Sequence, residues 1–261
     1  MDNVTRIKIY DETKEISLQK YPNVEKSIKY KYLNIEMIPR FNKTIVKVVN
    51  NDTINATLDL KRNNYHPILL NMSDHYMPGG CVLMGYSSQE ESCFRRTNYF
   101  LTLKRDFYPM CNIDTIYSPN VTVFRKDEES KYEIMEKEEH ISFIASPAIC
   151  GPKTDYDNTT FTDKDEIDLA EEKIRMIFKT AYKHNHDSLV LSAWGCGVFH
   201  NPGEHISRMF KEIIHEYDGC FKIIVFAIME NNSSWRPWLP QKGSAATLGN
   251  FQIFKNTFKS I

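Results

Sequence analysis

Residues 188–229 read SLVLSAWGCGVFHNPGEHISRMFKEIIHEYDGCFKIIVFAIM, and this stretch decides the fold. It begins and ends with apolar runs, at residues 188–193 and 221–229, of the kind found in buried strands. Between the two runs, apolar residues recur at spacings of three and four, which predicts a helix over residues 202–217 with one buried face. Strands that alternate with helices predict a largely parallel sheet covered on both faces. The residues of the buried helix face are Ile206, Met209, Phe210, Ile213 and Ile214.

The same alternation extends through most of the chain. Further buried strands are predicted at residues 45–49, 67–72, 121–125 and 141–146. An amphipathic helix is predicted around residues 167–181, and Phe251, Phe254 and Phe258 indicate a closing helix. The predicted fold class is therefore α/β, with a central mixed sheet between helices.

Three polar regions interrupt this pattern. The first forty residues are rich in Lys and Asn and lack clear periodicity, so a short helix after Asp11 is the one element predicted there. We expect residues 1–40 to form an N-terminal extension that packs on the core of a single domain spanning residues 1–261. Residues 127–139 and 155–165 are acidic and contain few apolar side chains, which predicts a solvated hairpin tip and a surface loop.

The composition limits the classes of function. The 33 basic and 34 acidic residues nearly cancel, so we expect no binding of bulk nucleic acid. The start of the chain lacks a signal-peptide pattern and the longest apolar run, residues 223–229, is too short to span a membrane, so an intracellular, cytoplasmic protein is expected, with the nucleus not excluded. The near-neutral charge gives no reason to expect an obligate assembly, so a monomer is expected. The six cysteines show neither Cys-x-x-Cys pairs nor zinc-site spacing, which predicts free thiols, no metal and no cofactor.

Residues 71–91 read NMSDHYMPGGCVLMGYSSQEE and contain the first candidate site. The glycine turn at Gly79 and Gly80 follows a strand end, where backbone N–H groups can approach a diphosphate because no Cβ is in the way. Two adjacent glycines, taken alone, are more typical of an ordinary tight turn. The turn alone therefore does not distinguish a phosphate cradle from a structural loop.

The end of this segment also has two interpretations. Ser88 and Glu91 have the spacing of a capping box, in which the Glu side chain bonds back to the Ser88 backbone at the start of a helix. Alternatively, Glu90 and Glu91 place carboxylates beside a phosphate cradle, where a proton donor could meet a glycosidic leaving group. The combination of features favours the second interpretation, although the spacing alone does not prove it.

A second glycine-containing segment, WGCGVFHNP, covers residues 194–202. It follows a predicted strand and precedes a predicted helix, with Asn201 as N-cap and Pro202 in the first turn. Gly195 and Gly197 give a backbone that can surround a ligand, and Phe199 offers a flat face to a sugar or base. A plain strand-to-helix turn with Phe199 in the core is the structural alternative. Both segments are predicted at the carboxyl edge of the sheet, where ligands bind in open α/β folds.

These motifs resemble the microbial-type poly(ADP-ribose) glycohydrolases, a macrodomain family whose signature has three glycines, a short gap and Gln-Glu-Glu. The matching blocks occur in the order of the family from about residue 45 onward. They are residues 78–81 with Gly85, residues 89–92, residues 117–121 with 123–125, residues 145–148, residues 195–199 with Asn201 and Pro202, and residues 225–228.

The resemblance implies a macrodomain fold that binds ADP-ribose, or poly(ADP-ribose) on modified proteins, and cleaves its ribose–ribose linkages. It implies that Glu91 is the general acid and base and that Glu90 contacts ribose hydroxyls, so both are assigned to the catalytic site. The residues implied to bind substrate are Asn71, Gly79, Gly80, Cys81, Gln89, Gly195, Cys196, Gly197, Val198 and Phe199.

Cys81 departs from the family pattern, because it stands at the third glycine of the signature. A side chain there narrows the site and excludes a positive φ that glycine permits, so weaker catalysis or an altered substrate preference is expected. A non-catalytic ADP-ribose reader is therefore the main alternative. A hydrolase of mono-ADP-ribosyl conjugates or of a free NAD-derived nucleotide also remains open.

Overall fold

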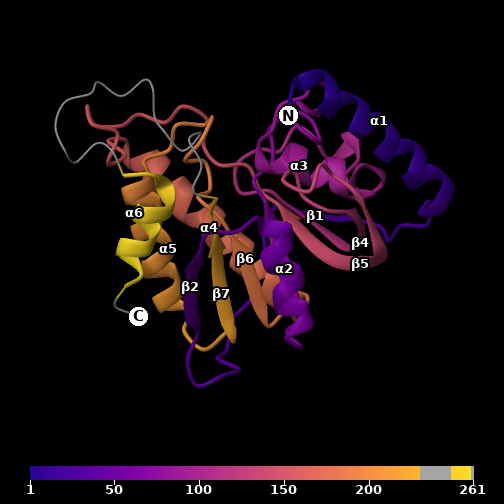
Figure 1. The fold of residues 1–261 in the computed structure, drawn as a ribbon. Helices are drawn as coiled ribbons and strands as arrows, with labels where there is room; N and C mark the ends of the chain where they lie inside the picture. Colours follow the sequence, from indigo (N-terminus) through magenta and orange to yellow (C-terminus); the bar gives the residue numbers. More distant parts are fainter. Residues whose placement is uncertain (230–247, 260–261) are drawn as a thin grey trace.

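The computed structural model describes residues 1–229 and 248–259, which form a three-layer α/β arrangement (Figure 1). The strands are β1 (Ile28–Tyr30), β2 (Ile45–Val49), β3 (Pro67–Asn71), β4 (Thr115–Arg125), β5 (Ile134–Ala145), β6 (Ser188–Leu191) and β7 (Ile223–Ala227). The α-helices are α1 (Asn3–Lys20), α2 (Thr53–Arg62), α3 (Gln89–Arg96), α4 (Lys164–Lys183), α5 (Gly203–Glu216) and α6 (Asn250–Thr257). Short 3₁₀ turns are η1 (Val82–Met84), η2 (Tyr99–Leu101) and η3 (Arg105–Phe107).

The strands form one mixed sheet in the order β1-β4-β5-β3-β6-β7-β2. The pairs β5–β3, β3–β6, β6–β7 and β7–β2 are parallel, whereas β4 pairs antiparallel with both β5 and β1. The prediction of a central mixed, largely parallel sheet between helices is therefore confirmed. The predicted helices at residues 167–181, 202–217 and 251–258 correspond to α4, α5 and α6.

The sheet separates two hydrophobic clusters, because successive strand residues point to opposite faces. In β6, Leu189 and Leu191 belong to the cluster formed with α4, α5 and α6, while Val190 belongs to the cluster formed with α2 and α3. Burial on both faces explains why the central strands read as continuous apolar runs. Figure 1 shows α5 and α6 at one end of the molecule and α1 beside α3 at the other.

Helix α1 differs most from the prediction, because it spans 18 residues and begins well before Asp11. Its N-cap is Asp2, whose carboxylate accepts a hydrogen bond from the backbone N–H of Thr5 at 2.8 Å. The buried face includes Thr13 and Ser17, which bond through their hydroxyls to backbone carbonyls. Polar residues on the buried face remove the apolar periodicity by which the helix could have been recognised.

Two strands also differ in extent from the prediction, and one strand was not predicted. The strand predicted at residues 121–125 begins at Thr115, and an irregular register between Ser118 and Val121, with Asn120 at φ 46°, interrupts its pattern. The acidic stretch 127–139 is a hairpin turn only in its first half, since β5 begins at Ile134. The edge strand β1 was not predicted because it has three residues and none of them is fully buried.

The parallel strands place their carboxyl ends at one edge of the sheet, where the segments after β3, β5 and β6 meet. All six cysteines are free thiols, as predicted. Within the described ranges, no helix is long and apolar enough to cross a membrane, and no cluster of His, Cys, Asp and Glu has the arrangement of a metal site.

Candidate active site

The segment after β3 wraps around the N-terminus of α3, where three consecutive side chains hold it. Gln89 is the first, and its amide is fully engaged by the chain. Its Oε1 accepts a hydrogen bond from the Met72 N–H at 3.0 Å, and its Nε2 donates to the Leu70 carbonyl at 2.9 Å and to the Thr53 hydroxyl at 3.2 Å. Gln89 therefore fixes the end of β3 against α3.

Glu90 is 3% exposed, and both of its carboxylate oxygens accept hydrogen bonds from this segment. Oε1 accepts from Asn71 Nδ2 and from the Gly79 N–H, both at 3.1 Å, and Oε2 accepts from the Asp74 N–H at 2.7 Å. Burial raises the pKa of Glu90 to about 8, although the three N–H donors act in the opposite direction. The side chain sits at the centre of the loop and orders it.

Glu91 is 6% exposed and is held at one oxygen only. Its Oε1 accepts a hydrogen bond from the Cys81 N–H at 2.9 Å, whereas its Oε2 is buried without a partner among the described residues. Ser88 is the N-cap of α3, but its side chain makes no cap bond, and the Glu91 carboxylate bonds to Cys81 rather than to the Ser88 backbone. The capping-box interpretation is therefore wrong for Glu91.

The glycine turn passes directly over the two carboxylates. Gly80 has φ 52°, and a Cβ built on it would lie 2.8 Å from Glu91 Oε1 and 3.3 Å from Glu90 Oε2. Gly79 has φ 81°, and its Cβ would lie 2.7 Å from the Phe94 ring. Both positions require glycine for two reasons: a Cβ would clash with neighbouring side chains, and the backbone has a positive φ.

Cys81 adopts φ −97°, which any L-residue accepts, so the predicted conflict with a positive φ at this position does not occur. Burial raises the pKa of the Cys81 thiol, and the carboxylates of Glu91, Asp74 and Glu90 raise it further. The thiol is therefore protonated at neutral pH and unsuited to act as a nucleophile.

The segment after β6 is organised differently, around the amide of Asn201. Its Nδ2 lies 2.6 Å from the Ile149 carbonyl, 3.1 Å from that of Gly195 and 3.3 Å from that of Phe199. Asn201 was predicted to be the N-cap of the following helix, but Pro202 is the N-cap of α5 and makes no side-chain cap bond. The Asn201 side chain instead turns back and closes the loop.

We call the segment after β3 the first loop and the segment after β6 the second loop. The bonds to Asn201 leave backbone N–H donors of the second loop available. The N–H groups of Gly197, Val198 and Phe199 have no acceptor among the described residues, and Gly197 and Val198 are exposed. In the first loop, by contrast, the N–H groups of Gly79 and Cys81 are already bound by carboxylates. The diphosphate cradle predicted in the first loop is therefore largely occupied by the chain's own carboxyl groups, while the second loop can receive an external anion.

His75 joins the two loops and was not recognised from the sequence. Its ring stacks on that of Phe199, with centroids 5.6 Å apart and an angle of 21° between the planes. Its Nε2 lies 2.6 Å from the Ala148 carbonyl, and its Nδ1 lies 3.3 Å from that of Met110. A histidine between a strand and a glycine turn carries no sequence signal for such a role.

The remaining predicted residues lie in the same region in different settings. Asn71 is fully buried, Cys196 is buried with its Sγ 3.4 Å from the Trp194 carbonyl, and Val198 is 70% exposed. Gly195 has φ 74°, and a Cβ there would lie 2.5 Å from Ala148 Cβ. The structure thus brings the two predicted segments together at one edge of the sheet.

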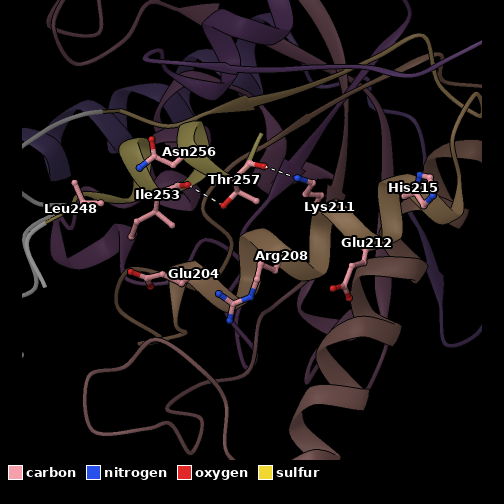
Figure 2. Close-up of a pocket in the computed structure, with 9 residues that line it drawn as sticks. All are labelled: Glu204, Arg208, Lys211, Glu212, His215, Leu248, Ile253, Asn256 and Thr257. Atoms are coloured by element: carbon pink, nitrogen blue, oxygen red, sulfur yellow. Dashed lines mark hydrogen bonds between the residues drawn. The ribbon is translucent and has the colours of Figure 1, made fainter. Parts of the chain in front are cut away.

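A groove of about 710 Å³ lies elsewhere, between α5 and α6 (Figure 2). Its floor is tied across the two helices by the Lys211 Nζ, which donates to the Thr257 carbonyl at 3.1 Å. It is lined by Glu204, Arg208, Lys211, Glu212, His215, Leu248, Ile253, Asn256 and Thr257. None of these residues belongs to the predicted site.

The sheet, its two helical layers and the loops at its carboxyl edge define a macrodomain-like α/β protein. Residues 5–126, a little under half of the chain, match the family model of the microbial-type PARG catalytic domain. The resemblance seen in the motifs is therefore confirmed in this range, which contains the Gln-Glu-Glu segment. The match begins at residue 5, within α1, so part of the predicted N-terminal extension lies within the matched catalytic domain.

Solved structures extend the likeness in fold. Poly(ADP-ribose) glycohydrolase from Thermomonospora curvata has a TM-score of 0.75 and 22% identity, covering 98% of this chain and 100% of that chain; a second structure contains the inhibitor ADP-HPD. Poly(ADP-ribose) glycohydrolase from Deinococcus radiodurans in complex with ADP-ribose has a TM-score of 0.65 and 24% identity, covering 85% and 86%. A sequence search of curated proteins finds no match.

Proposed function

We propose that this chain is a poly(ADP-ribose) glycohydrolase that releases ADP-ribose, with Glu91 as its general acid and base. One observation carries the assignment. Glu91 is fixed at one oxygen by the Cys81 N–H, while its other oxygen is buried without a partner among the described residues. A carboxyl group held at one oxygen and free at the other is positioned to exchange a proton with a bound substrate.

The chemistry needs a single carboxyl group at the scissile bond. Glu91 protonates the departing ribose oxygen as the anomeric carbon gains oxocarbenium character, and then removes a proton from the attacking water. The negative charge of the substrate's own diphosphate stabilises the cationic sugar, so a second protein carboxylate is not required as nucleophile. Glu90, whose oxygens are both engaged, orders the loop on which Glu91 depends.

The second loop supplies the complementary half of the binding site. Its N–H groups at Gly197, Val198 and Phe199 are successive backbone donors without an acceptor among the described residues, which a diphosphate can bind. The Phe199 ring, fixed by its stack on His75, offers a flat surface to the adjoining ribose. The proposal is supported more coarsely by the Deinococcus radiodurans protein of similar fold, whose structure is a complex with ADP-ribose.

The alternative of a non-catalytic reader was based on Cys81, and the backbone part of that argument no longer holds. Cys81 provides its N–H to Glu91 in an ordinary conformation. The main chain makes this hydrogen bond, so the bond does not depend on which side chain stands at position 81. We therefore expect Cys81→Gly to change the rate of release less than tenfold.

The decisive experiment measures the release of ADP-ribose from poly(ADP-ribosyl)ated protein by the wild type and by Glu91→Gln. We expect the variant to lose activity by about a hundred- to ten-thousand-fold, because it removes a positioned proton donor. Its affinity for ADP-ribose should stay within a fewfold of the wild type. Glu138→Gln, which changes an exposed carboxylate on β5, is the matched control and should retain full activity.

Two results would contradict this proposal. Equal rates for the wild type and Glu91→Gln would remove Glu91 from the reaction. Binding of ADP-ribose without release by the wild type, from polymer or from modified protein, would favour the reader.

A further inference from the structure

The side chain of His75 contacts three other segments at the carboxyl edge of the sheet. Its ring stacks on that of Phe199 in the second loop, with centroids 5.6 Å apart and 21° between the planes. Its Nε2 lies 2.6 Å from the Ala148 carbonyl oxygen, after β5, and its Nδ1 lies 3.3 Å from that of Met110, before β4. The Met110 N–H in turn donates to the His75 carbonyl at 2.8 Å. His75 therefore ties the first loop to the second.

Residues 148–151 hold both members of this stack. The Ala148 carbonyl accepts from the His75 ring, and the Gly151 N–H donates to the Phe199 carbonyl at 2.9 Å. One ring is thus attached to this segment by its edge and the other by its backbone. Because both attachments are made to the same four residues, they fix the position of the two rings relative to each other.

The backbone on either side of His75 is held by carboxyl groups. The Asp74 N–H donates to Glu90 Oε2 at 2.7 Å, and the two N–H groups that follow His75 donate to Asp74 Oδ1 at 2.6 and 3.0 Å. Glu90 stands next to Glu91 in the first turn of α3. His75 is therefore fixed relative to the helix turn that carries the proposed acid and base.

Two properties of histidine are used at this position. The flat ring covers the Phe199 ring, and Nε2 donates to the Ala148 carbonyl oxygen, which can only accept. Phenylalanine would keep the ring and lose the donor, whereas glutamine would keep a donor and lose the ring. These two substitutions therefore separate the stack from the hydrogen bond.

We propose that His75 is a positioning residue for ADP-ribose, which holds the Phe199 ring against the ribose that carries the scissile bond. The inference rests on the proposed function, in which the diphosphate lies on the second loop and the anomeric carbon at Glu91. The ribose with this anomeric carbon is attached directly to the diphosphate, so it spans the two loops that the stack joins. His75 acts through Phe199, so its loss should weaken binding of this ribose and spare the proton transfer by Glu91.

The test compares the binding of two ligands to the wild type and to His75→Ala by calorimetric titration. ADP-ribose contains the ribose in question, and ADP has the same adenosine diphosphate without it. We expect His75→Ala to weaken binding of ADP-ribose about tenfold and binding of ADP by less than about twofold. KM for release from poly(ADP-ribose) should rise by a similar factor while kcat stays within about threefold, because the lost contact is made in the ground state and the transition state alike.

Two further variants show which contact of His75 matters, and a third is the control. If the stack positions Phe199, His75→Phe binds ADP-ribose more tightly than His75→Gln, since only the first keeps a ring. His184→Ala is the matched control, because His184 is a partly exposed histidine outside both loops. It stacks on Tyr117 with centroids 3.5 Å apart, and its Nε2 lies 3.0 Å from the Tyr30 hydroxyl. His184→Ala should bind both ligands as the wild type does.

Equal losses for ADP-ribose and ADP would overturn the inference, because they would show that His75 only shapes the loops. An unchanged affinity of His75→Ala for ADP-ribose would also overturn it, as would binding by His75→Gln that is as tight as binding by His75→Phe. The inference and the proposed function can fail separately, because the titrations need no turnover. The expected affinities without any release by the wild type would overturn the hydrolase and leave the role of His75 in place.

Discussion

The loops after β3 and after β6 begin at the same edge of the sheet and both contain glycine turns, yet they use opposite backbone groups. The loop after β3 directs its N–H groups inward, where the carboxylates of Glu90 and Glu91 bind them. The loop after β6 directs its Gly195 and Phe199 carbonyls inward to the Asn201 amide and leaves N–H groups exposed. Carboxyl side chains as anchors therefore give a loop suited to hold catalytic groups, and an amide side chain as anchor gives a loop suited to bind an anion.

Among substitutions of the loop glycines, the largest effect is expected from Gly80→Ala, in the first loop. The new methyl group would lie 2.8 Å from Glu91 Oε1, so the carboxylate must move away from the Cys81 N–H. We expect kcat to fall about a hundredfold, because small displacements of a catalytic group have effects of this size. Steady-state kinetics measures kcat, and unchanged kcat would show that the position of Glu91 does not matter. ADP-ribose affinity should fall much less, since the donors of the second loop are intact.

Gly195→Ala, in the second loop, should have the complementary effect. Its methyl group would lie 2.6 Å from the Asn201 Nδ2, and φ 74° adds backbone strain, so the loop must open. We expect affinity for ADP-ribose to fall about tenfold, with a smaller loss in kcat. Glu138→Gln, which changes an exposed carboxylate on β5 outside both loops, is the control. Calorimetric titration with ADP-ribose distinguishes the two variants, and equal affinities would contradict the assigned role of the Gly195 turn.

The third effect concerns stability as a function of pH, and only the first loop should show it. The pKa of Glu90 is raised to about 8 in the folded state, above its value of about 4.3 in an unfolded chain, so the folded state binds more protons between these values. Stability from this group is present at low pH and is lost as pH rises toward 8, by at most about 1.4 kcal/mol per pH unit. Denaturant unfolding from pH 5 to 8 should show this decline in the wild type and a flatter profile in Glu90→Gln. Parallel profiles would show that Glu90 is ionised throughout.

The fold could be predicted well for the elements whose buried side chains are apolar. The central strands β3, β6 and β7 are buried on both faces, and α4 and α5 bury one apolar face, so their periods are visible in the sequence. Helix α1 could not be predicted in full because Thr13 and Ser17 occupy its buried face. The strands β4 and β5 are longer than predicted, because bulges and charged residues break the alternation of apolar and polar residues along them.

The candidate site could be located from the sequence, but its internal bonds could not. The Gln89-Glu90-Glu91 run and the glycine turns predicted which segments meet. Nothing in the spacing indicated that Glu91 bonds to Cys81 rather than to Ser88, or that Asn201 turns back to three carbonyls instead of capping α5. These bonds depend on how a loop closes in space, and neighbouring residues along the chain do not specify it.

The polar contact between α1 and α3 has a consequence for how the two helices can move. The Thr13 hydroxyl donates to the Arg95 carbonyl at 2.7 Å, near the carboxyl end of the helix that begins with Gln89. Apolar side chains can slide past one another at little cost, whereas a hydroxyl bonded to one carbonyl defines a single register. Helix α1 therefore fixes the position of α3 along the axis of α3. It thereby also fixes where the first turn of α3 contacts the glycine loop.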